Sequence, residues 1–292
     1  MGKKICFAVP TFPGHYLYAL DFMKSFAEYQ YDKQADLFFI FTTPEERDGF
    51  MPCNSIVLPK SLRIMANKGI INIKKFYALM QLKDRYEYII VIDDECLFCK
   101  TVDLNEICTS FFERKILYGN IVENAPWDFA HIVPDCCRKF FDKETQKKLN
   151  CPIYLWFNQL PIYRTADLKE FFKMTDMGHR IHYLTYNDFD YYIYMFYLIA
   201  ERDFDIVDIG IVANRAFVEI TSECCYTLVE KKDKIQHVYM STLDAKNSLF
   251  LEDVFLLCHC DRDIAKPKSK NKISRLITAF VSYFRIKNTI VG

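Results

Sequence analysis

An apolar run that leads directly into three acidic residues constrains the fold of this chain more than any other feature. The run extends from Tyr88 to Ile92, and Asp93, Asp94 and Glu95 follow it. A short, β-branched run with polar sequence on either side predicts a strand that is buried on both faces, as in a parallel sheet. In open α/β sheets, ligands bind beyond the carboxyl ends of the strands, which is where these acids fall.

The spacing of Asp93 and Glu95 indicates a cation site. Residues two apart project to the same side of an extended backbone. Two carboxylates on one side form an oxygen-rich site suited to Mg²⁺ or Mn²⁺, which is commonly shared with phosphate oxygens. The competing interpretation is an acidic turn that follows a core strand, and the spacing alone does not separate the two.

Strand and helix patterns alternate along the first hundred residues. The expected order is β-α-β-β-α-β, which predicts an α/β fold with a mostly parallel central sheet and helices on both faces. The strands are expected at 5–9, 37–41, 56–58 and 88–92, and the helices at 16–29 and 74–83. A turn with Thr11, His15 and Tyr16 lies at the end of another strand, the first, and could hold the base of a nucleotide; plain turn residues are the competing interpretation.

The later sequence is more varied. Residues 123–149 have no clear period and are expected to form a long loop over the site. Thr165 is expected to cap a helix. Further helices are expected at 103–112 and 191–200, and strands at 116–122, 206–211, 217–221, 237–240 and 254–257.

The last thirty residues differ in composition from the rest. Basic residues gather there, and apolar residues recur at helical spacing between Ile273 and Phe284. A basic amphipathic helix beside a neutral body is typical of docking on an anionic membrane surface. An ordinary helix packed on the domain, or pairing with a second copy, would use the same apolar face. We therefore expect a domain at 1–260 and a tail at 261–292.

Composition excludes several classes. The formal net charge is zero, which argues against bulk nucleic-acid binding. Neither a dinucleotide-binding nor a P-loop glycine pattern occurs, and no apolar run is long enough to span a membrane. The twelve cysteines are scattered, which favours reduced thiols in a cytoplasmic protein. Together with the tail, this predicts a cytoplasmic protein peripheral to the inner face of a membrane.

Four segments resemble glycosyltransferase family 8, the retaining sugar transferases with the GT-A fold and an acid-x-acid (D-x-D) motif. The segments are the basic helix with Lys74 and Lys75 that precedes the 88–95 strand; Trp156-Phe157-Asn158; Asn187-Asp188-Phe189-Asp190; and Cys258-His259-Cys260, followed by Lys266-Pro267. The resemblance covers most of residues 1–267. It departs from the family pattern at Gln159, Leu160 and Phe189, and in the spacing between His259 and Lys266.

The resemblance implies a role for each of these residues. Asp93, Glu95 and His259 would hold Mn²⁺ or Mg²⁺, and Asp188, Asp190 and Asn158 would lie at the transferred sugar. The donor would meet a set made up of Thr11, His15, Tyr16, Lys74, Lys75, Asp94 and Lys266. The donor implied is UDP-galactose or UDP-glucose, and the hexose would pass to a glycan or lipid-linked acceptor in polysaccharide biosynthesis.

Two other functions use the same features. A nucleotidyltransferase also combines such a sheet with metal-binding carboxylates, but it would normally carry a glycine-rich, basic loop after its first strand. The turn Pro10-Thr11-Phe12-Pro13-Gly14-His15 has neither lysine nor arginine. A non-catalytic scaffold at the membrane, with a degenerate transferase core, is the third interpretation.

Overall fold

The computed structural model describes residues 2–64, 69–98, 101–121, 129–150, 153–154, 160–208, 234–240 and 255–261. Its centre is a five-stranded sheet in the order β3-β2-β1-β4-β8. The strands β1 (Ile5–Pro10), β2 (Ala35–Phe41), β3 (Ser55–Val57) and β4 (Tyr88–Val91) are parallel, and β8 (Ile162–Arg164) runs antiparallel to β4. The mostly parallel sheet predicted from the sequence is therefore confirmed.

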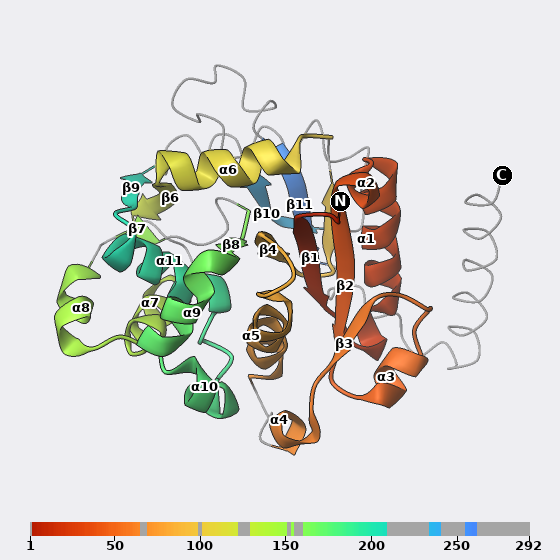
Figure 1. The fold of residues 1–292 in the computed structure, drawn as a ribbon, viewed down its shortest axis with the longest axis horizontal. Helices are drawn as coiled ribbons and strands as arrows, with labels where there is room; N and C mark the ends of the chain where they lie inside the picture. The colour runs from red at the N-terminus through yellow and green to blue at the C-terminus, as the bar shows by residue number, and fades with distance from the viewer. Residues whose placement is uncertain are drawn as a thin grey trace.

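Helices flank this sheet (Figure 1). The helix α5 (Ile70–Leu82) packs on β1, β2 and β4, while α1 (Tyr16–Glu28) packs on β5 (Cys96–Phe98). At the end where β1 begins, α6 (Leu104–Arg114) crosses the molecule, and α3 (Pro44–Asp48) and α4 (Lys60–Ile64) lie at the opposite end. The acidic residues that follow β4 belong to this second end.

Two smaller sheets complete the described fold. One has the order β10-β11-β5 and the other β7-β6-β9. Their remaining strands are β6 (Ile116–Ile121), β7 (Ile153–Tyr154), β9 (Asp205–Asp208), β10 (Lys234–Met240) and β11 (Phe255–Asp261). The other helical elements are η1 (Pro13–His15), α2 (Tyr31–Gln34), α7 (Phe129–Arg138), α8 (Lys143–Lys148), α9 (Thr165–Met174), α10 (Met177–Arg180), η3 (Ile181–Tyr183) and α11 (Asp190–Glu201).

Aromatic side chains form the core between β1, α1 and β5. Phe98 is fully buried, and its ring centroid lies 4.3 Å from that of Tyr31, 5.5 Å from Phe22 and 5.7 Å from Phe7. Offset and edge-on aromatic pairs at such distances add to the free energy gained by burying the rings. This cluster anchors β5, and with it the acidic segment between β4 and β5.

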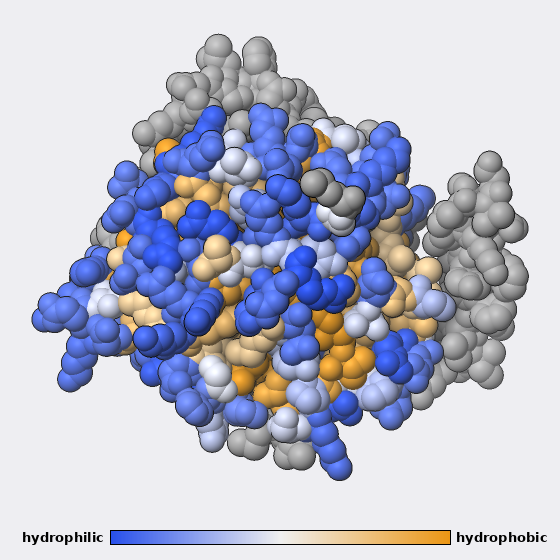
Figure 2. Space-filling view, in the orientation of Figure 1, coloured by the Kyte–Doolittle hydropathy of each residue, from blue (hydrophilic) through white to orange (hydrophobic). Residues whose placement is uncertain are grey.

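The surface of the face drawn in Figure 2 is largely hydrophilic, with a hydrophobic area near its centre, over the region of α5 and β3. Side chains of both elements are partly exposed, among them Ile56, Val57, Tyr77 and Met80. Among the helices of the described ranges, none is long and apolar enough to cross a membrane.

Three local predictions are wrong. Residues 129–138 and 143–148 form α7 and α8 in place of the expected loop, because Val133 and Cys137 are buried and Asp142 caps α8 by accepting from the Thr145 amide at 2.8 Å. The helix α5 begins at Ile70, four residues before the expected start. Thr165 does not cap α9, since its hydroxyl donates to the Tyr86 carbonyl at 2.7 Å.

The expected extended backbone at the acids is also wrong. The strand β4 ends at Val91, and Asp94 and Glu95 lie in a turn in which the Cys96 amide donates to the Asp93 carbonyl at 3.4 Å. The next strand, β5, then joins a different sheet. Asp93 consequently faces Lys75, whereas Asp94 and Glu95 face His15. The strand expected at 217–221 and the tail after residue 261 lie outside the described residues.

Candidate functional site at the carboxyl ends of β1 and β4

The predicted site lies where the direction of the chain through the sheet reverses. From β1 the sheet continues through β2 and β3 on one side, while β4 lies on the other side of β1. Such a switch point leaves a crevice at the carboxyl ends of the two strands, and ligands of open α/β sheets bind there. Thr11 follows β1 and Asp93 follows β4, so both lie at this point.

A buried lysine joins two acids of the predicted site. The ammonium of Lys75 on α5 lies 3.0 Å from Oδ1 of Asp93 and 3.6 Å from Oδ1 of Asp190, the first residue of α11. Burial alone would lower the pKa of Lys75, but the two carboxylates outweigh it, so the pKa is raised. Lys75 is therefore held in its charged form.

Tyr163 holds the other oxygen of Asp190. Its hydroxyl donates to Oδ2 of Asp190 at 2.6 Å, and both side chains are buried. Burial, followed by the charge of Asp190, raises the pKa of Tyr163 well above its usual value, so the phenol stays protonated and remains a donor. Sequence reasoning missed this residue, because nothing in the chain near Tyr163 indicates that β8 faces α11.

A histidine from the first turn contacts the other two acids. Nδ1 of His15 lies 3.0 Å from Oδ1 of Asp94, and its Nε2 lies 3.9 Å from Oε1 of Glu95. Burial raises the pKa of Asp94, and the interaction with His15 opposes that rise. The second oxygen of Asp94, Oδ2, is buried without a hydrogen-bond partner. The structure thus brings together His15, Asp94 and Glu95, three of the predicted site residues.

Three residues predicted to meet a donor substrate are linked to one another. The ammonium of Lys74 donates to the Thr11 carbonyl at 2.6 Å and lies 3.7 Å from Oε2 of Glu46, while the Tyr16 hydroxyl donates to the Glu46 carbonyl. Burial lowers the pKa of Lys74, against the opposing effect of Glu46 and Asp94. This group fixes the turn after β1 to α5 and α3.

The loop before α11 is fixed from within and from α5. Oδ2 of Asp188 accepts from the Thr185 amide at 2.6 Å and from the Thr185 hydroxyl at 2.7 Å. Nδ2 of Asn72 donates to the carbonyls of Thr185 and Tyr186 at 2.8 and 3.1 Å. Asn72 was not predicted, and its only signal in the sequence is an amide within an apolar stretch of helix. These bonds position the segment that leads to Asp190.

Close backbone packing explains one glycine at this junction. A Cβ at Gly69 would lie 1.9 Å from the Leu184 carbonyl oxygen, which no side chain permits. The absence of a side chain at Gly69 lets the start of α5 approach the 184–186 loop. Glycine at this position is therefore part of what holds Lys75 against Asp190.

The remaining predicted residues are only partly described. The backbone of His259 is paired in β11 with Cys96 of β5 and with His237 of β10. That pairing places residue 259 beside the strand that begins directly after Glu95. Asn158 and Lys266 lie outside the described residues.

The donor set at the site suits a hard divalent cation. Asp93 and Glu95 contribute carboxylate oxygens, which Mg²⁺ and Mn²⁺ prefer. Within the ranges that the structure describes, no three acidic, histidine or cysteine side chains gather into a complete metal site. Asp93 and Glu95 are the two predicted metal ligands whose side chains the structure describes.

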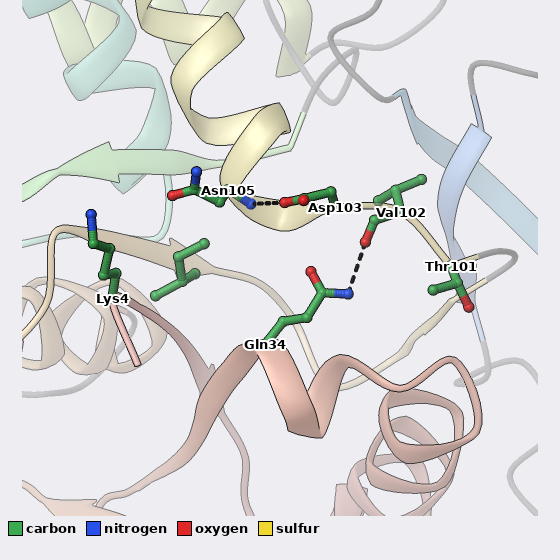
Figure 3. A pocket seen from close by; sticks show the side chains of 7 residues that line it. Lys4, Gln34, Thr101, Val102, Asp103 and Asn105 are labelled. Atoms are coloured by element: carbon green, nitrogen blue, oxygen red, sulfur yellow. Dashed lines mark hydrogen bonds between the residues drawn. The ribbon is translucent and has the colours of Figure 1, made fainter. Parts of the chain in front are cut away.

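A separate hollow lies at the opposite end of the sheet. It has a volume of about 640 Å³ and lies where β1 begins, beside the start of α6 (Figure 3). Gln34 crosses it and donates to the Val102 carbonyl at 2.9 Å. Its lining consists of Lys4, Ile5, Gln34, Thr101, Val102, Asp103 and Asn105, none of which belongs to the acidic site.

Comparison with known proteins gives no family. No model of a protein family matches the sequence, and no curated protein matches it. Two of the solved structures to which the chain is similar are of S. aureus TarS. The structure of TarS 1–349 has a TM-score of 0.37 and 16% identity over 71% of this chain and 58% of that one. The other has a TM-score of 0.36 and 13% identity over 71% of this chain and 35% of that one. The chain thus spans less than two thirds of either, and similarity at this level does not carry a function.

Proposed function

We propose that this chain is a metal-dependent glycosyltransferase that moves a hexose from a nucleoside diphosphate sugar to a glycan or lipid-linked acceptor. The observation that supports it is the gathering of charge at the switch point of the sheet. Asp93 from the end of β4 and Asp190 from the start of α11 meet around one buried ammonium, that of Lys75. Charged groups brought together from distant segments and withdrawn from water are typical of functional sites.

The chemistry follows from where charge develops. When a sugar leaves a nucleoside diphosphate, negative charge grows on the departing phosphate oxygens. A divalent cation on Asp93 and Glu95, with His259 as a further ligand, would stabilise that charge as a Lewis acid. Lys75 contacts both carboxylates and keeps its positive charge, so it adds a second positive charge near the same place.

The crevice between the ends of β1 and β4 is proposed to receive the donor. Thr11, His15 and Tyr16 belong to the segment that follows β1, Lys74 donates to the Thr11 carbonyl, and Asp94 contacts His15. They already form hydrogen bonds or ion pairs within the protein, so they would form one preorganised side of the donor site. Lys266 and Asn158 remain candidates from the resemblance, for the phosphates and for the sugar. The resemblance favours UDP-galactose and UDP-glucose as donors. The basic tail is proposed to dock on an anionic membrane surface.

The test is a thermal-shift panel of nucleotide sugars with and without Mn²⁺. A ligand that binds only the folded state stabilises it by about 2.7 kcal/mol at a hundredfold excess over its Kd. We expect one UDP-sugar to raise Tm only in the presence of Mn²⁺. The shift should vanish in the Asp93→Ala, Glu95→Ala double variant, but persist in a Glu106→Ala, Glu113→Ala control on α6.

Turnover separates the proposal from its two alternatives. A glycosyltransferase releases UDP from the stabilising sugar nucleotide, whereas a nucleotidyltransferase releases pyrophosphate from a nucleoside triphosphate. No shift and no turnover with any nucleotide would leave the acids as a plain turn, and the scaffold interpretation would then hold.

A further inference from the structure

Asp93 already has a cation in contact with it. The Lys75 ammonium lies 3.0 Å from Oδ1 of Asp93, whose side chain is 26% exposed, while that of Lys75 is only 10% exposed. A divalent ion approaching Asp93 from solvent therefore meets a carboxylate whose charge is partly neutralised from the protein side. Two cations on one carboxylate repel each other, and a single charge within 4–6 Å changes the proton affinity of a carboxylate by 1–3 pK units.

Asp190 is a second carboxylate with which the Lys75 ammonium can pair. Its Oδ1 lies 3.6 Å from Nζ of Lys75, so a shift of less than one ångström toward Asp190 would bring the ammonium as close to Asp190 as it now lies to Asp93. The other oxygen of Asp190 accepts the Tyr163 hydroxyl at 2.6 Å. That bond withdraws negative charge from Asp190 and so weakens its hold on Lys75. Tyr163 thereby sets how the ammonium divides itself between the two acids.

The ring of Tyr163 is fixed independently of this bond. Its centroid lies 4.5 Å from that of Tyr194 and 5.6 Å from that of Tyr191, both on α11. Its backbone pairs with Ile89 of β4, four residues before Asp93. Removing the hydroxyl alone should therefore leave the ring in place. A Tyr163→Phe variant can thus test Tyr163 as a positioning residue without disturbing the packing around it.

We propose that Lys75 is a built-in cation that competes with a divalent metal ion for Asp93, and that Tyr163 and Asp190 set the strength of that competition. The proposal rests on the proposed function, because it concerns the same metal site. It adds that metal binding moves Lys75 toward Asp190. The Lys75 ammonium would then lie on Asp93 when no metal is bound, and on Asp190 when a metal ion occupies Asp93. The sequence alone gives no sign of this, since Lys75, Asp93, Tyr163 and Asp190 come from four separate elements.

The experiment measures the Kd of Mn²⁺ for the full chain by electron paramagnetic resonance of the free ion, without any substrate. Lys75→Met removes the competitor and should tighten Mn²⁺ binding by about tenfold or more, the effect of one nearby charge. Tyr163→Phe frees Asp190 to draw Lys75 away, and should also tighten binding. Asp190→Asn leaves Lys75 wholly on Asp93, and should weaken it.

Tyr163→Phe and Asp190→Asn change the size of the side chain very little, yet they are expected to change the Kd for Mn²⁺ in opposite directions. Tyr194→Phe is the matched control: it deletes the hydroxyl of a buried tyrosine that stacks on Tyr163 but bonds to Arg164 and Asp167 instead of Asp190. We expect its Kd for Mn²⁺ to equal that of the wild type. If Lys75→Met does not fold, the Tyr163 and Asp190 variants still decide the question.

Two results would overturn the competition. If Mn²⁺ binds the wild type through Asp93 and the three variants bind it equally well, the network is structural, and the proposed function is untouched. If neither the wild type nor Lys75→Met binds Mn²⁺, the site takes no divalent ion. Both the proposed competition and the proposed metal-dependent function would then be wrong. Binding by Lys75→Met alone would support the competition most directly.

Discussion

Nδ1 of His15 lies 3.0 Å from Oδ1 of Asp94, and this contact joins the turn after β1 to the turn after β4 across 79 residues of sequence. Both side chains are withdrawn from water, with exposed fractions of 14% and 4%. A contact between two strand ends at this depth fixes the turn after β1 to the turn after β4, so it is relevant to stability.

The first prediction concerns this pair. His15→Ala removes the side-chain partner of the buried Asp94 carboxyl group, and leaving a buried acceptor without its hydrogen bond costs about 1–3 kcal/mol, more for a charged group. Urea unfolding should show that loss. The double variant His15→Ala, Asp94→Asn carries no orphaned charge, so it should recover a large part of the stability. A double variant as unstable as His15→Ala would contradict this account.

The second prediction concerns the aromatic cluster beneath β5. Phe98→Ala opens a cavity among Phe7, Phe22 and Tyr31, and truncation of a buried phenylalanine costs about 3–5 kcal/mol. Phe98→Leu fills more of that volume and should cost clearly less. Both values are obtained from the midpoints of guanidinium unfolding at constant slope. Because β5 begins directly after the acids, the alanine variant should also weaken Mn²⁺ binding, although Phe98 touches no ligand.

The third prediction is the pH dependence of thiol reactivity at Cys53. Burial raises the pKa of Cys53 from 9.0 to about 11. The thiolate is the reactive form, so a rise of two pK units lowers its population near pH 8 about a hundredfold. Alkylation of Cys53 by iodoacetamide, followed by peptide mass spectrometry between pH 7.5 and 9.5, should accelerate about tenfold per unit without levelling off. A plateau near pH 9 would show an ordinary, solvated thiol.

Other thiols provide an internal comparison. The described cysteines Cys6, Cys53, Cys96, Cys108, Cys136 and Cys137 are all free of disulfides. Burial raises the pKa of Cys108 and Cys137 above the usual range, and their side chains are inaccessible to reagent. These two should react only after unfolding, whereas Cys136, which is partly exposed, should react in the native protein.

The elements that the sequence predicted well are those whose signal is local. The strands Ile5–Pro10 and Tyr88–Val91 are buried along their whole length, and Ala35–Phe41 is apolar and buried from Phe38 onward, so all three are easily found as apolar runs. The helices α7 and α8 were missed because α7 contains Pro134, which argues locally against a helix. Burial of Val133 and Cys137 outweighs the backbone hydrogen bond that this proline removes.

The candidate site shows the same division. The acids and the turn with His15 could be predicted because they follow apolar runs that indicate strands, whereas the two lysines were predicted from the resemblance to glycosyltransferase family 8. The pairing of Lys75 with Asp190, and the bond from Tyr163, depend on how α11 and β8 pack against α5 and β4. No local pattern encodes those distances. The roles of Asp188 and Asp190 at the sugar, and of Asn158, Lys266 and His259, stay predictions.

The last prediction concerns the start of α6, which faces the hollow at the far end of the sheet. Oδ1 of Asp103 accepts from the backbone amides of Asn105 and Glu106 at 2.8 and 3.1 Å, as an N-cap residue does. Asp103→Ala removes this cap and should cost about 1 kcal/mol, while Asp103→Ser keeps an acceptor and should cost less. Urea unfolding measures both. Because Asp103 lies at the opposite end of β1 from Asp93, neither variant should change the Kd for Mn²⁺, and a change in that Kd would show that the two ends of the sheet are coupled.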